Sequence, residues 1–318
     1  MIAKFAATAT LLLSFSVACA QEYPVREIRS ICNFAAGSGA DIIVRFYSDR
    51  LSKLAGKPVL VENKPGAQGT LASDFVAKSK PDGYTLMITP ASSTLATAPY
   101  IFKKLPFDPL KDFAPVTSVA ALSFVLAVDA AKPIKSIDEL VKVLKSKLNH
   151  GFYGTGSNTG QVAAELFKEK LGLQTVYVPY KVTVYALAGV VGGGVDFISY
   201  DTTWAVTQHP HRLRILAVTA AKRQSALPDV PTLSELGLGE FDIAPWFGVV
   251  VPAGTPRPVI DRLAGWFNQI TNAEDTKAFL ARAALDPFPG SPEQMAAHLQ
   301  AETQRWGRWV QMAKIEPQ

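Results

Sequence analysis

The feature that most constrains the fold of this chain is a strand, glycine bend and helix pattern that occurs twice. The first copy is SICNFAAGSGADIIVRFYSDRL at residues 30–51, and the second is HGFYGTGSNTGQVAAELFKEKLGL at residues 150–173. In each copy, an apolar run leads into glycines and hydroxyl side chains, and apolar residues then recur at helical spacing. We therefore expect two similar α/β sheets, one built around each bend.

Strands and helices alternate along the rest of the chain. Runs typical of strands occur at 27–34, 57–66, 84–89, 123–130, 175–180, 195–200, 213–220 and 246–256. Helical patterns occur at 42–54, 69–80, 136–147, 160–171, 183–191, 259–270 and 295–310. This alternation predicts parallel sheets with helices on both faces. The apolar content of 48% is enough to bury two cores.

Residues 1–20 have the pattern of a secretory signal peptide. Lys4 precedes an apolar segment at 5–17, and the sequence ACA follows at 18–20. The apolar run is shorter than the roughly 20 residues that span a bilayer, and the small residues around position 19 are typical of a cleavage site. We expect export and cleavage after residue 20. Lipidation of Cys19 is the alternative, which Ser16 disfavours because such sites usually have a large aliphatic residue there.

Charge and cysteine content exclude several classes of protein. The formal net charge is +5, and the basic residues are spread without a block, so nucleic acid is not an expected partner. The chain has two cysteines, Cys19 and Cys32, and removal of the signal peptide leaves one of them. An intrachain disulfide is therefore excluded, and Cys32 is expected to be a small buried hydrophobic residue.

The glycine bends have the composition of anion-binding corners. One contains Gly37, Ser38 and Gly39, the other spans 154–160, and a third loop after strand 84–89 adds hydroxyls at 92–94. Ligands of parallel sheets bind beyond the carboxyl ends of the strands. Helices that begin there direct free N–H groups and a partial positive charge at the ligand. We expect recognition of a carboxylate or another small oxyanion, with plain turns and helix caps as the alternative.

Motifs of catalysis are incomplete in this chain. Thr155-Gly156-x-x-x-Gly160 is like a nucleotide-binding turn, and Tyr177-x-x-x-Lys181 is like the pair of short-chain dehydrogenases. The pair follows the turn too closely, however, and a proline inside it prevents the required helix. The chain has neither a G-x-S-x-G elbow nor a histidine spacing typical of a metal site. We therefore expect no catalysis, no cofactor and no metal.

Many phrases in succession resemble the extracytoplasmic solute receptors of tripartite tricarboxylate transporters, often called Bug receptors. They are YPVREIRSICNFAAGSGADIIVR, PVLVENKPGAQG, KPDGYTLMI, LPFDPLKDFAPVT, VPYKV, LRILAVTAAKRQSALPDVPTLSELGL and WFGVVVPAGTP. The resemblance implies a type II periplasmic-binding-protein fold with two α/β domains, a two-crossing hinge and a cleft between them. It implies domain 1 at 21–122 and 246–318, domain 2 at 123–245, and a periplasmic location.

The resemblance also implies a set of ligand-binding residues. They are Phe34, Ala35, Gly37, Ser38, Gly39, Asp41, Ser92, Ser93, Thr94, Gly154, Thr155, Ser157, Asn158, Thr159, Tyr200 and Asp201. This chain departs from the family pattern where Ala35 and Ala36 replace prolines and where Tyr200 replaces an aspartate, with Trp204 just beyond. Aromatic side chains in place of a carboxylate favour a flatter, less polar ligand, so we expect an aromatic or extended carboxylate ahead of citrate.

The expected partners follow from the same resemblance. They are a small carboxylate and the membrane permease subunits of a tripartite tricarboxylate transporter, with the receptor itself a monomer. Two alternatives remain open from the residues. One is a secreted enzyme, either a hydrolase or a dehydrogenase that uses Tyr177 and Lys181, and the other is a sensory receptor that signals to a membrane kinase.

Overall fold

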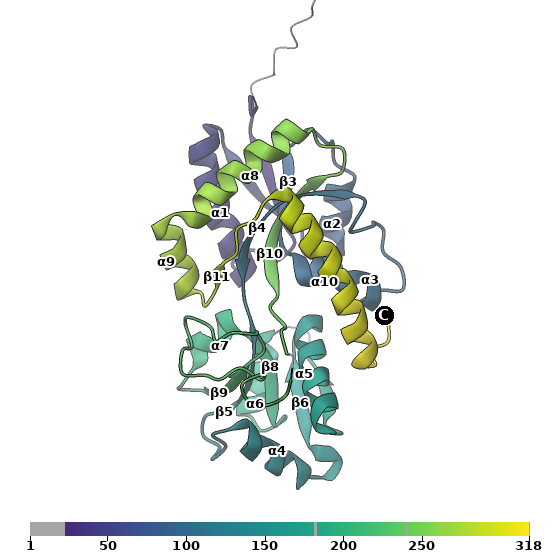
Figure 1. The fold of residues 1–318 in the computed structure, drawn as a ribbon, viewed down its shortest axis with the longest axis vertical. Coiled ribbons are helices and arrows are strands. Elements are labelled where there is room, and N and C mark those ends of the chain that lie inside the picture. Colours follow the sequence, from purple (N-terminus) through teal and green to yellow (C-terminus); the bar gives the residue numbers. More distant parts are fainter. Residues whose placement is uncertain (1–22, 181–182, 240, 318) are drawn as a thin grey trace, which may run out of the picture.

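Two sheets, each with helices on both faces, lie end to end in this protein (Figure 1). The structure is a computed structural model that describes residues 23–180, 183–239 and 241–317. The expected signal peptide, Cys19 and Lys181 lie outside these ranges. None of the helices within them is long and apolar enough to cross a membrane.

Sheet A contains strands from both ends of the chain. In spatial order these are β11 (Asp286–Pro287), β4 (Phe113–Ala121), β10 (Trp246–Pro252), β3 (Thr85–Pro90), β1 (Ile28–Cys32) and β2 (Val59–Asn63). Sheet B contains the strands between them, in the order β7 (Val176–Pro179), β6 (Phe152–Thr155), β8 (Phe197–Asp201), β5 (Phe124–Asp129) and β9 (Leu213–Val218).

Helices cover both faces of each sheet. Around sheet A lie α1 (Gly39–Ala55), α2 (Thr70–Ala77), α3 (Ala98–Ile101), α8 (Arg257–Asn272), α9 (Glu274–Arg282) and α10 (Pro292–Met312). Around sheet B lie α4 (Ile137–Lys145), α5 (Asn158–Leu171), α6 (Thr183–Val191) and α7 (Thr202–Gln208). Single turns form at η1 (Ala67–Gly69), η2 (Ser92–Ala96) and η3 (Leu148–His150).

The expected parallel pairing holds for only part of each sheet. Strands β1, β2 and β3 are parallel, as are β6, β7 and β8. However, β10 runs antiparallel to β3 and β4, and β5 runs antiparallel to β8 and β9. Strand β10 is antiparallel because the chain re-enters sheet A from sheet B, and β5 is antiparallel because β4 leads directly into it without a helix. Strand β5 enters sheet B at the junction and runs away from the junction, whereas β6 and β8 run towards the junction.

The strand register places the carboxyl ends of the parallel strands of both sheets at the junction between the sheets. Only residues 122–123 separate β4 from β5. Pro90, at the end of β3, pairs with Phe247 at the start of β10, and Asp201, at the end of β8, pairs with Phe124 at the start of β5. Both crossings therefore lie at the edges where β1, β3, β6 and β8 end, which is where parallel sheets bind ligands.

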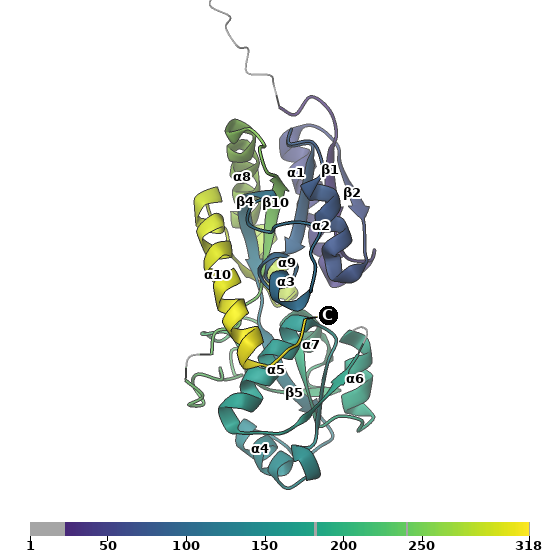
Figure 2. The ribbon, with the colours of Figure 1, turned by 90° about the vertical axis from the view of Figure 1, so that its right-hand side faces the viewer.

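One apolar cluster continues from sheet A into sheet B. Trp246 of β10 and Trp306 of α10 belong to the same buried cluster as Phe167 of α5. Helix α10 descends past the junction and packs against α5 (Figures 1 and 2). Since burial of each large apolar side chain contributes about 1.5–3 kcal/mol, this cluster holds the two halves together along one side.

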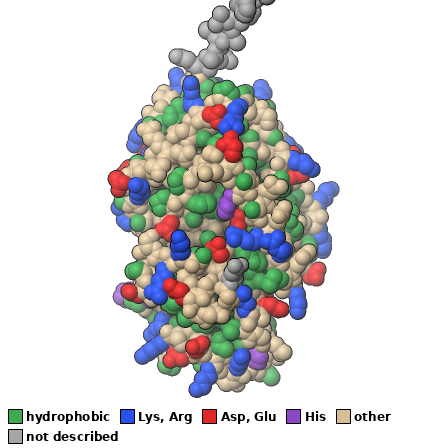
Figure 3. All heavy atoms as spheres, viewed as in Figure 1, with side chains coloured by type: hydrophobic (Ala, Val, Ile, Leu, Met, Phe, Trp, Pro, Cys, Tyr) green, Lys and Arg blue, Asp and Glu red, His purple; other side chains and the backbone are tan. Residues whose placement is uncertain are grey.

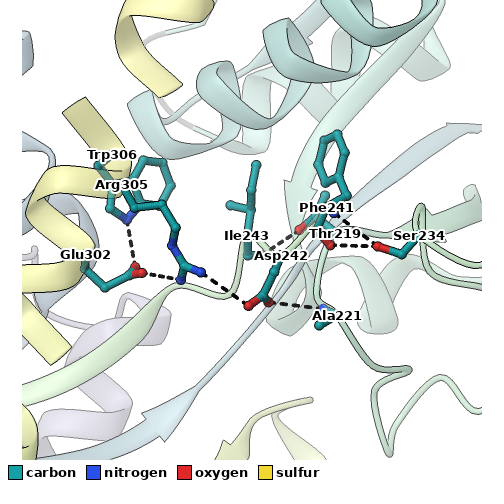
Figure 4. Close-up of polar contacts among 9 residues, drawn as sticks. All are labelled: Thr219, Ala221, Ser234, Phe241, Asp242, Ile243, Glu302, Arg305 and Trp306. Atoms are coloured by element: carbon teal, nitrogen blue, oxygen red, sulfur yellow. Dashed lines mark hydrogen bonds and ion pairs between the residues drawn. The ribbon is translucent and has the colours of Figure 1, made fainter. Parts of the chain in front are cut away.

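The return crossing, residues 241–245, is attached to both halves (Figure 4). The backbone N–H of Ile243 donates to the carbonyl of Thr219 at 2.8 Å. Asp242 accepts from the backbone N–H of Ala221 at 3.1 Å and pairs with Arg305 of α10 at 3.4 Å. The crossing is thus fixed to the end of β9 on one side and to α10 on the other.

The surface carries no block of one charge on the face seen in Figure 3. Lysine and arginine side chains are interspersed there with aspartate and glutamate side chains. Ion pairs such as Arg223–Glu235 and Arg257–Asp261 likewise join opposite charges at exposed positions. The small net charge is therefore spread over that face instead of being gathered into a patch.

Candidate functional site

The first glycine bend is shaped by reciprocal capping at the start of α1. The hydroxyl of Ser38 accepts from the backbone N–H of Asp41 at 3.2 Å, and the Asp41 carboxylate accepts from the N–H of Gly37 at 2.8 Å. Gly37 has a φ of +80°, a conformation that favours glycine. Phe34, Ala35 and Gly37 are exposed. The bend therefore presents backbone and an aromatic ring outward on a fixed frame.

The buried side chain of Asp41 stabilises this bend. Its side chain is buried, and it accepts hydrogen bonds from Arg45 Nε at 2.8 Å and from Asn63 Nδ2 at 2.7 Å. Burial alone would raise the pKa of the Asp41 carboxyl, but the hydrogen bonds from Arg45, Asn63 and Gly37 lower it below its usual value. Its charge is therefore already compensated, which limits its repulsion of an anion at the bend.

The third predicted loop is a helical turn, η2, which packs against α10. Ser92 is fully buried, and its hydroxyl accepts from the backbone N–H of Trp246 at 3.1 Å. The Thr94 hydroxyl accepts from Asn33 Nδ2 at 3.0 Å and is buried as well. Ser93 is half-buried and donates to the carbonyl of Pro90 at 3.1 Å. The side chains of Ser92 and Thr94 thus hold η2 in place.

The second glycine bend is also capped. The Ser157 hydroxyl accepts from the N–H of Gly160 at 3.1 Å, and the buried Thr155 hydroxyl accepts from the N–H of Ser157 at 3.3 Å. A Cβ atom on Gly160 would lie 2.4 Å from Thr155 Oγ1, so this glycine permits the turn. Asn158 begins α5, half-buried, and Thr159 follows it, buried.

Packing explains the glycine inside β6. A Cβ atom on Gly154 would lie 2.7 Å from Cε2 of Tyr180, and one on Gly189 would lie 2.1 Å from the Tyr180 hydroxyl oxygen. Both glycines make room for this ring. The requirement for glycine at 154 therefore comes from the interior of sheet B.

Tyr200 and Asp201 lie on different sides of the end of β8. Tyr200 is fully buried in the apolar cluster beneath α6, where burial raises its pKa. Asp201 caps α7 by accepting from the N–H of Trp204 at 3.0 Å. Burial raises the pKa of Asp201 to about 6, against the opposing effect of that hydrogen bond. Of the two, Asp201 is the one whose side chain contacts α7.

The first bend lies next to sheet B at the junction. A Cβ atom built on Gly39 would lie 3.8 Å from Nε1 of Trp204, so α7 of sheet B meets the start of α1 of sheet A. Helix α5, which begins at the second bend, packs against η2. The start of α1 therefore lies beside α7, and the helix that follows the second bend lies beside η2.

A separate cavity of about 350 Å³ lies between α5 and the end of α10. Its lining includes Glu165, Lys168, Met312 and Lys314, and none of the predicted ligand-binding residues. Lys168 forms an ion pair with Glu165 at 2.7 Å across this wall. The cavity is thus distinct from the junction of the bends.

Sequence reasoning omitted three residues from the predicted site. Trp204 contacts the first bend, Asn33 holds η2, and Asn63 holds Asp41. A signal for the two asparagines was available, because Asn33 directly follows β1 and Asn63 ends β2. Polar residues at the carboxyl ends of adjacent parallel strands lie at the same edge.

The comparison with known families decides the membership of this chain. The family described as "Tripartite tricarboxylate transporter family receptor" matches residues 43–315. The chain belongs to this receptor family. Its members are substrate-binding receptors and not enzymes, so the secreted-enzyme alternative is wrong.

Several relatives match most of the length of this receptor. A UPF0065 protein of Bordetella bronchiseptica is 35% identical over 312 residues, which cover 96% of this chain and 91% of that protein. The structure described as R. palustris Rpa4515 with adipate has a TM-score of 0.85 and 30% identity, covering 93% of this chain and 100% of that one. MatC (Rpa3494) from Rhodopseudomonas palustris with bound malate has a TM-score of 0.79 and 28% identity, with 91% and 100% covered. The expected periplasmic-binding-protein fold is confirmed.

Proposed function

We propose that this receptor captures a small carboxylate between its two sheets. The observation that carries the proposal is that the first bend lies next to α7 of sheet B, with Gly39 of α1 beside Trp204. Helices α1 and α5 both begin at this junction, each capped by a serine. The N-termini of these helices carry partial positive charge, which suits a carboxylate. Two related structures are described with adipate and with malate, both dicarboxylates.

Ligand binding is coupled to closure in this proposal. The two halves, residues 21–122 with 246–318 and residues 123–245, move about the crossings at 122–123 and 241–245. A ligand held by both halves favours the closed arrangement by its differential affinity for it. The residues predicted from the family resemblance contribute in two ways, some by contact and others, such as Asp41, Ser92 and Thr94, by holding the contacting backbone.

The preferred ligand is an aromatic or extended carboxylate. Phe34 and Trp204 are partly exposed and come from opposite halves of the receptor. Ala35 and Ala36 each retain a backbone N–H that a proline lacks. An aromatic or long apolar ligand packs against these two rings better than citrate does, because citrate carries three carboxylates.

Delivery to the permease of a tripartite tricarboxylate transporter completes the proposed role. The receptor acts in the periplasm as a monomer, after export directed by residues 1–20. Family membership supports this role. A sensory receptor that passes its loaded state to a membrane kinase is the remaining alternative, and transport assays with and without the permease genes separate the two.

Calorimetric and thermal-shift titrations test ligand capture. We expect adipate, malate or benzoate to bind saturably and raise the melting temperature, whereas the corresponding uncharged amides do not. Small-angle scattering is expected to show compaction with the bound acid. If no carboxylate binds saturably, or if amides bind equally well, the proposal is wrong. Native mass spectrometry of the purified receptor identifies any ligand carried from the cell.

A further inference from the structure

We propose that Trp204 determines the ligand specificity of this receptor. Its indole ring forms the wall against which a flat ligand body packs, and its N–H donates to the carboxylate held at the start of α1. This inference rests on the proposed capture of a carboxylate at the junction.

The position of Trp204 is the first argument. It belongs to α7, on the sheet B side, yet its Nε1 atom is the nearest heavy atom to a Cβ position on Gly39 of α1. The residue is 38% exposed, and its Nε1 has no hydrogen-bond partner within the described ranges of the chain. An indole N–H is a donor only. It therefore faces the N-terminus of α1 as an additional donor from the opposite half of the receptor.

The rigidity of α7 is the second argument. Asp201 caps its first turn through the backbone N–H of Trp204. Thr202 is fully buried; its N–H donates to the carbonyl of Ser123 at 3.0 Å and its hydroxyl to the carbonyl of Ala284 at 3.2 Å. The first turn of α7 is therefore anchored to the crossing and to the segment after α9, so the backbone of Trp204 is fixed.

The chemistry of the ring is the third argument. Aromatic groups gain from offset or edge-to-face contact in addition to the area they bury, whereas a puckered saturated ring gains only from area. A wall made of indole thus favours an aromatic acid over a saturated acid of the same size. Gly39 matters for the same reason, since the absence of a side chain there leaves the N–H edge of the indole accessible.

Two substitutions separate the roles of the ring and the N–H. Trp204→Phe keeps an aromatic wall and removes the donor, whereas Trp204→Ala removes both. The probes are benzoate with cyclohexanecarboxylate, and benzene-1,4-dicarboxylate with cyclohexane-1,4-dicarboxylate, since each pair differs mainly in ring flatness. Phe152→Ala is the matched control, because Phe152 is 45% exposed in the same half but at the opposite end of β6.

We expect wild type and Phe152→Ala to bind the aromatic member of a pair more tightly. Trp204→Phe is expected to weaken both members about tenfold, the effect of one hydrogen bond to a charged group, and to keep their ratio. Trp204→Ala is expected to bring the ratio close to one. Quenching of tryptophan fluorescence by the aromatic acids is expected in wild type and in Phe152→Ala, and is expected to be reduced in both Trp204 variants.

Each result has a defined meaning, provided that circular dichroism shows folded variants. Wild type that binds no carboxylate contradicts the proposed function itself. Wild type that binds adipate but no ring acid, or Trp204→Ala that keeps the wild-type ratio, overturns this inference and leaves the proposed function intact. A Trp204→Phe variant with wild-type affinities overturns the assignment of the indole N–H as a donor.

Discussion

Nη1 of Arg305 lies 3.4 Å from Oδ2 of Asp242, and this ion pair joins α10 to the return crossing. The same guanidinium contacts Glu302, whose side chain is almost fully buried and also accepts from Trp306 Nε1 at 2.9 Å (Figure 4). A buried carboxylate is stable only when its charge is compensated. Arg305 therefore compensates the charge of the buried Glu302 and also links α10 to the return crossing.

Replacement of Arg305 is expected to destabilise the receptor. Arg305→Ala leaves the Glu302 carboxylate buried without a cation, which we expect to lower the free energy of unfolding by about 2–3 kcal/mol. Glu302→Gln added to this variant is expected to restore part of the loss, because it removes the uncompensated charge. Arg308→Ala, at an exposed position of α10, is the control and is expected to change stability by less than about 0.5 kcal/mol. Equal losses for the two arginine variants in urea unfolding would contradict this account.

The substitution Gly39→Ala is expected to weaken carboxylate binding while the receptor stays folded. The new Cβ would lie 3.8 Å from Trp204 Nε1, an ordinary contact, and Gly39 occupies the first position of α1. Alanine favours a helix over glycine, so the melting temperature is expected to be unchanged or higher. Carboxylate affinity is expected to fall about tenfold, the cost of one blocked charged hydrogen bond, in calorimetry.

Gly265→Ala is the matched control for that experiment. Gly265 lies within α8, and a Cβ atom there meets nothing within 4 Å. We expect this variant to keep wild-type affinity. If both glycine variants lose affinity equally, the effect does not come from the gap between α1 and α7.

Asp201 is expected to make ligand binding dependent on pH. Because burial raises its pKa to about 6, the carboxyl is largely neutral below that pH and charged above it. A nearby anion binds more tightly to the neutral form. Affinity for benzoate, itself ionised above about pH 5.5, is expected to fall about fourfold between about pH 5.5 and 7.5, the effect of one like charge roughly 5 Å away in water. Asp201→Asn keeps the α7 cap and is expected to remove this dependence.

The same pKa has an opposite consequence for stability. Since the folded state holds the Asp201 proton more tightly than the unfolded state does, the contribution of Asp201 to stability is largest below about pH 4. It decreases as the pH rises from about 4 to 6. Urea unfolding of wild type and Asp201→Asn across this range measures the difference. A difference that stays constant with pH would show that Asp201 has an ordinary pKa.

Asp41 is expected to stabilise the receptor at neutral pH and to lose this effect in acid. Hydrogen bonds lower its folded-state pKa, so its contribution is complete above the unfolded-state value, near about 4, and is lost as the pH falls through the folded-state value. Asp41→Asn is expected to cost about 1–3 kcal/mol at neutral pH, since it weakens the bonds to Arg45 and Gly37. This cost is expected to shrink towards about pH 3. A cost that is the same at both pH values would contradict the charged role.

Local sequence patterns were sufficient to predict much of this fold. The 183–191 helix begins and ends where predicted, and serines precede both helices at the glycine bends. Strand direction was predicted less well. The antiparallel placement of β10 depends on where the chain re-enters sheet A, and no local pattern of residues 246–252 contains that information.

The predicted site was less accessible to sequence reasoning than the fold. Strand β8 is buried on both faces, so its apolar run gives no indication that Tyr200 packs in the core while Asp201 caps α7. The packing reason for Gly154 is Tyr180, a residue that follows the next strand. The contact between Gly39 and Trp204 joins residues from different sheets, and only the arrangement of the two halves reveals it.

The position of β10 between β4 and β3 has a consequence for how the chain assembles during synthesis. Until residue 252 has left the ribosome, the β1–β2–β3 unit and β4 have no strand to connect them. All of sheet B precedes β10 in the chain, so it can be completed while sheet A is still in two pieces. Sheet B begins later in the chain but can complete its strand pairing first. Strands β1–β4 of sheet A lack their central partner β10 until most of the protein has been made.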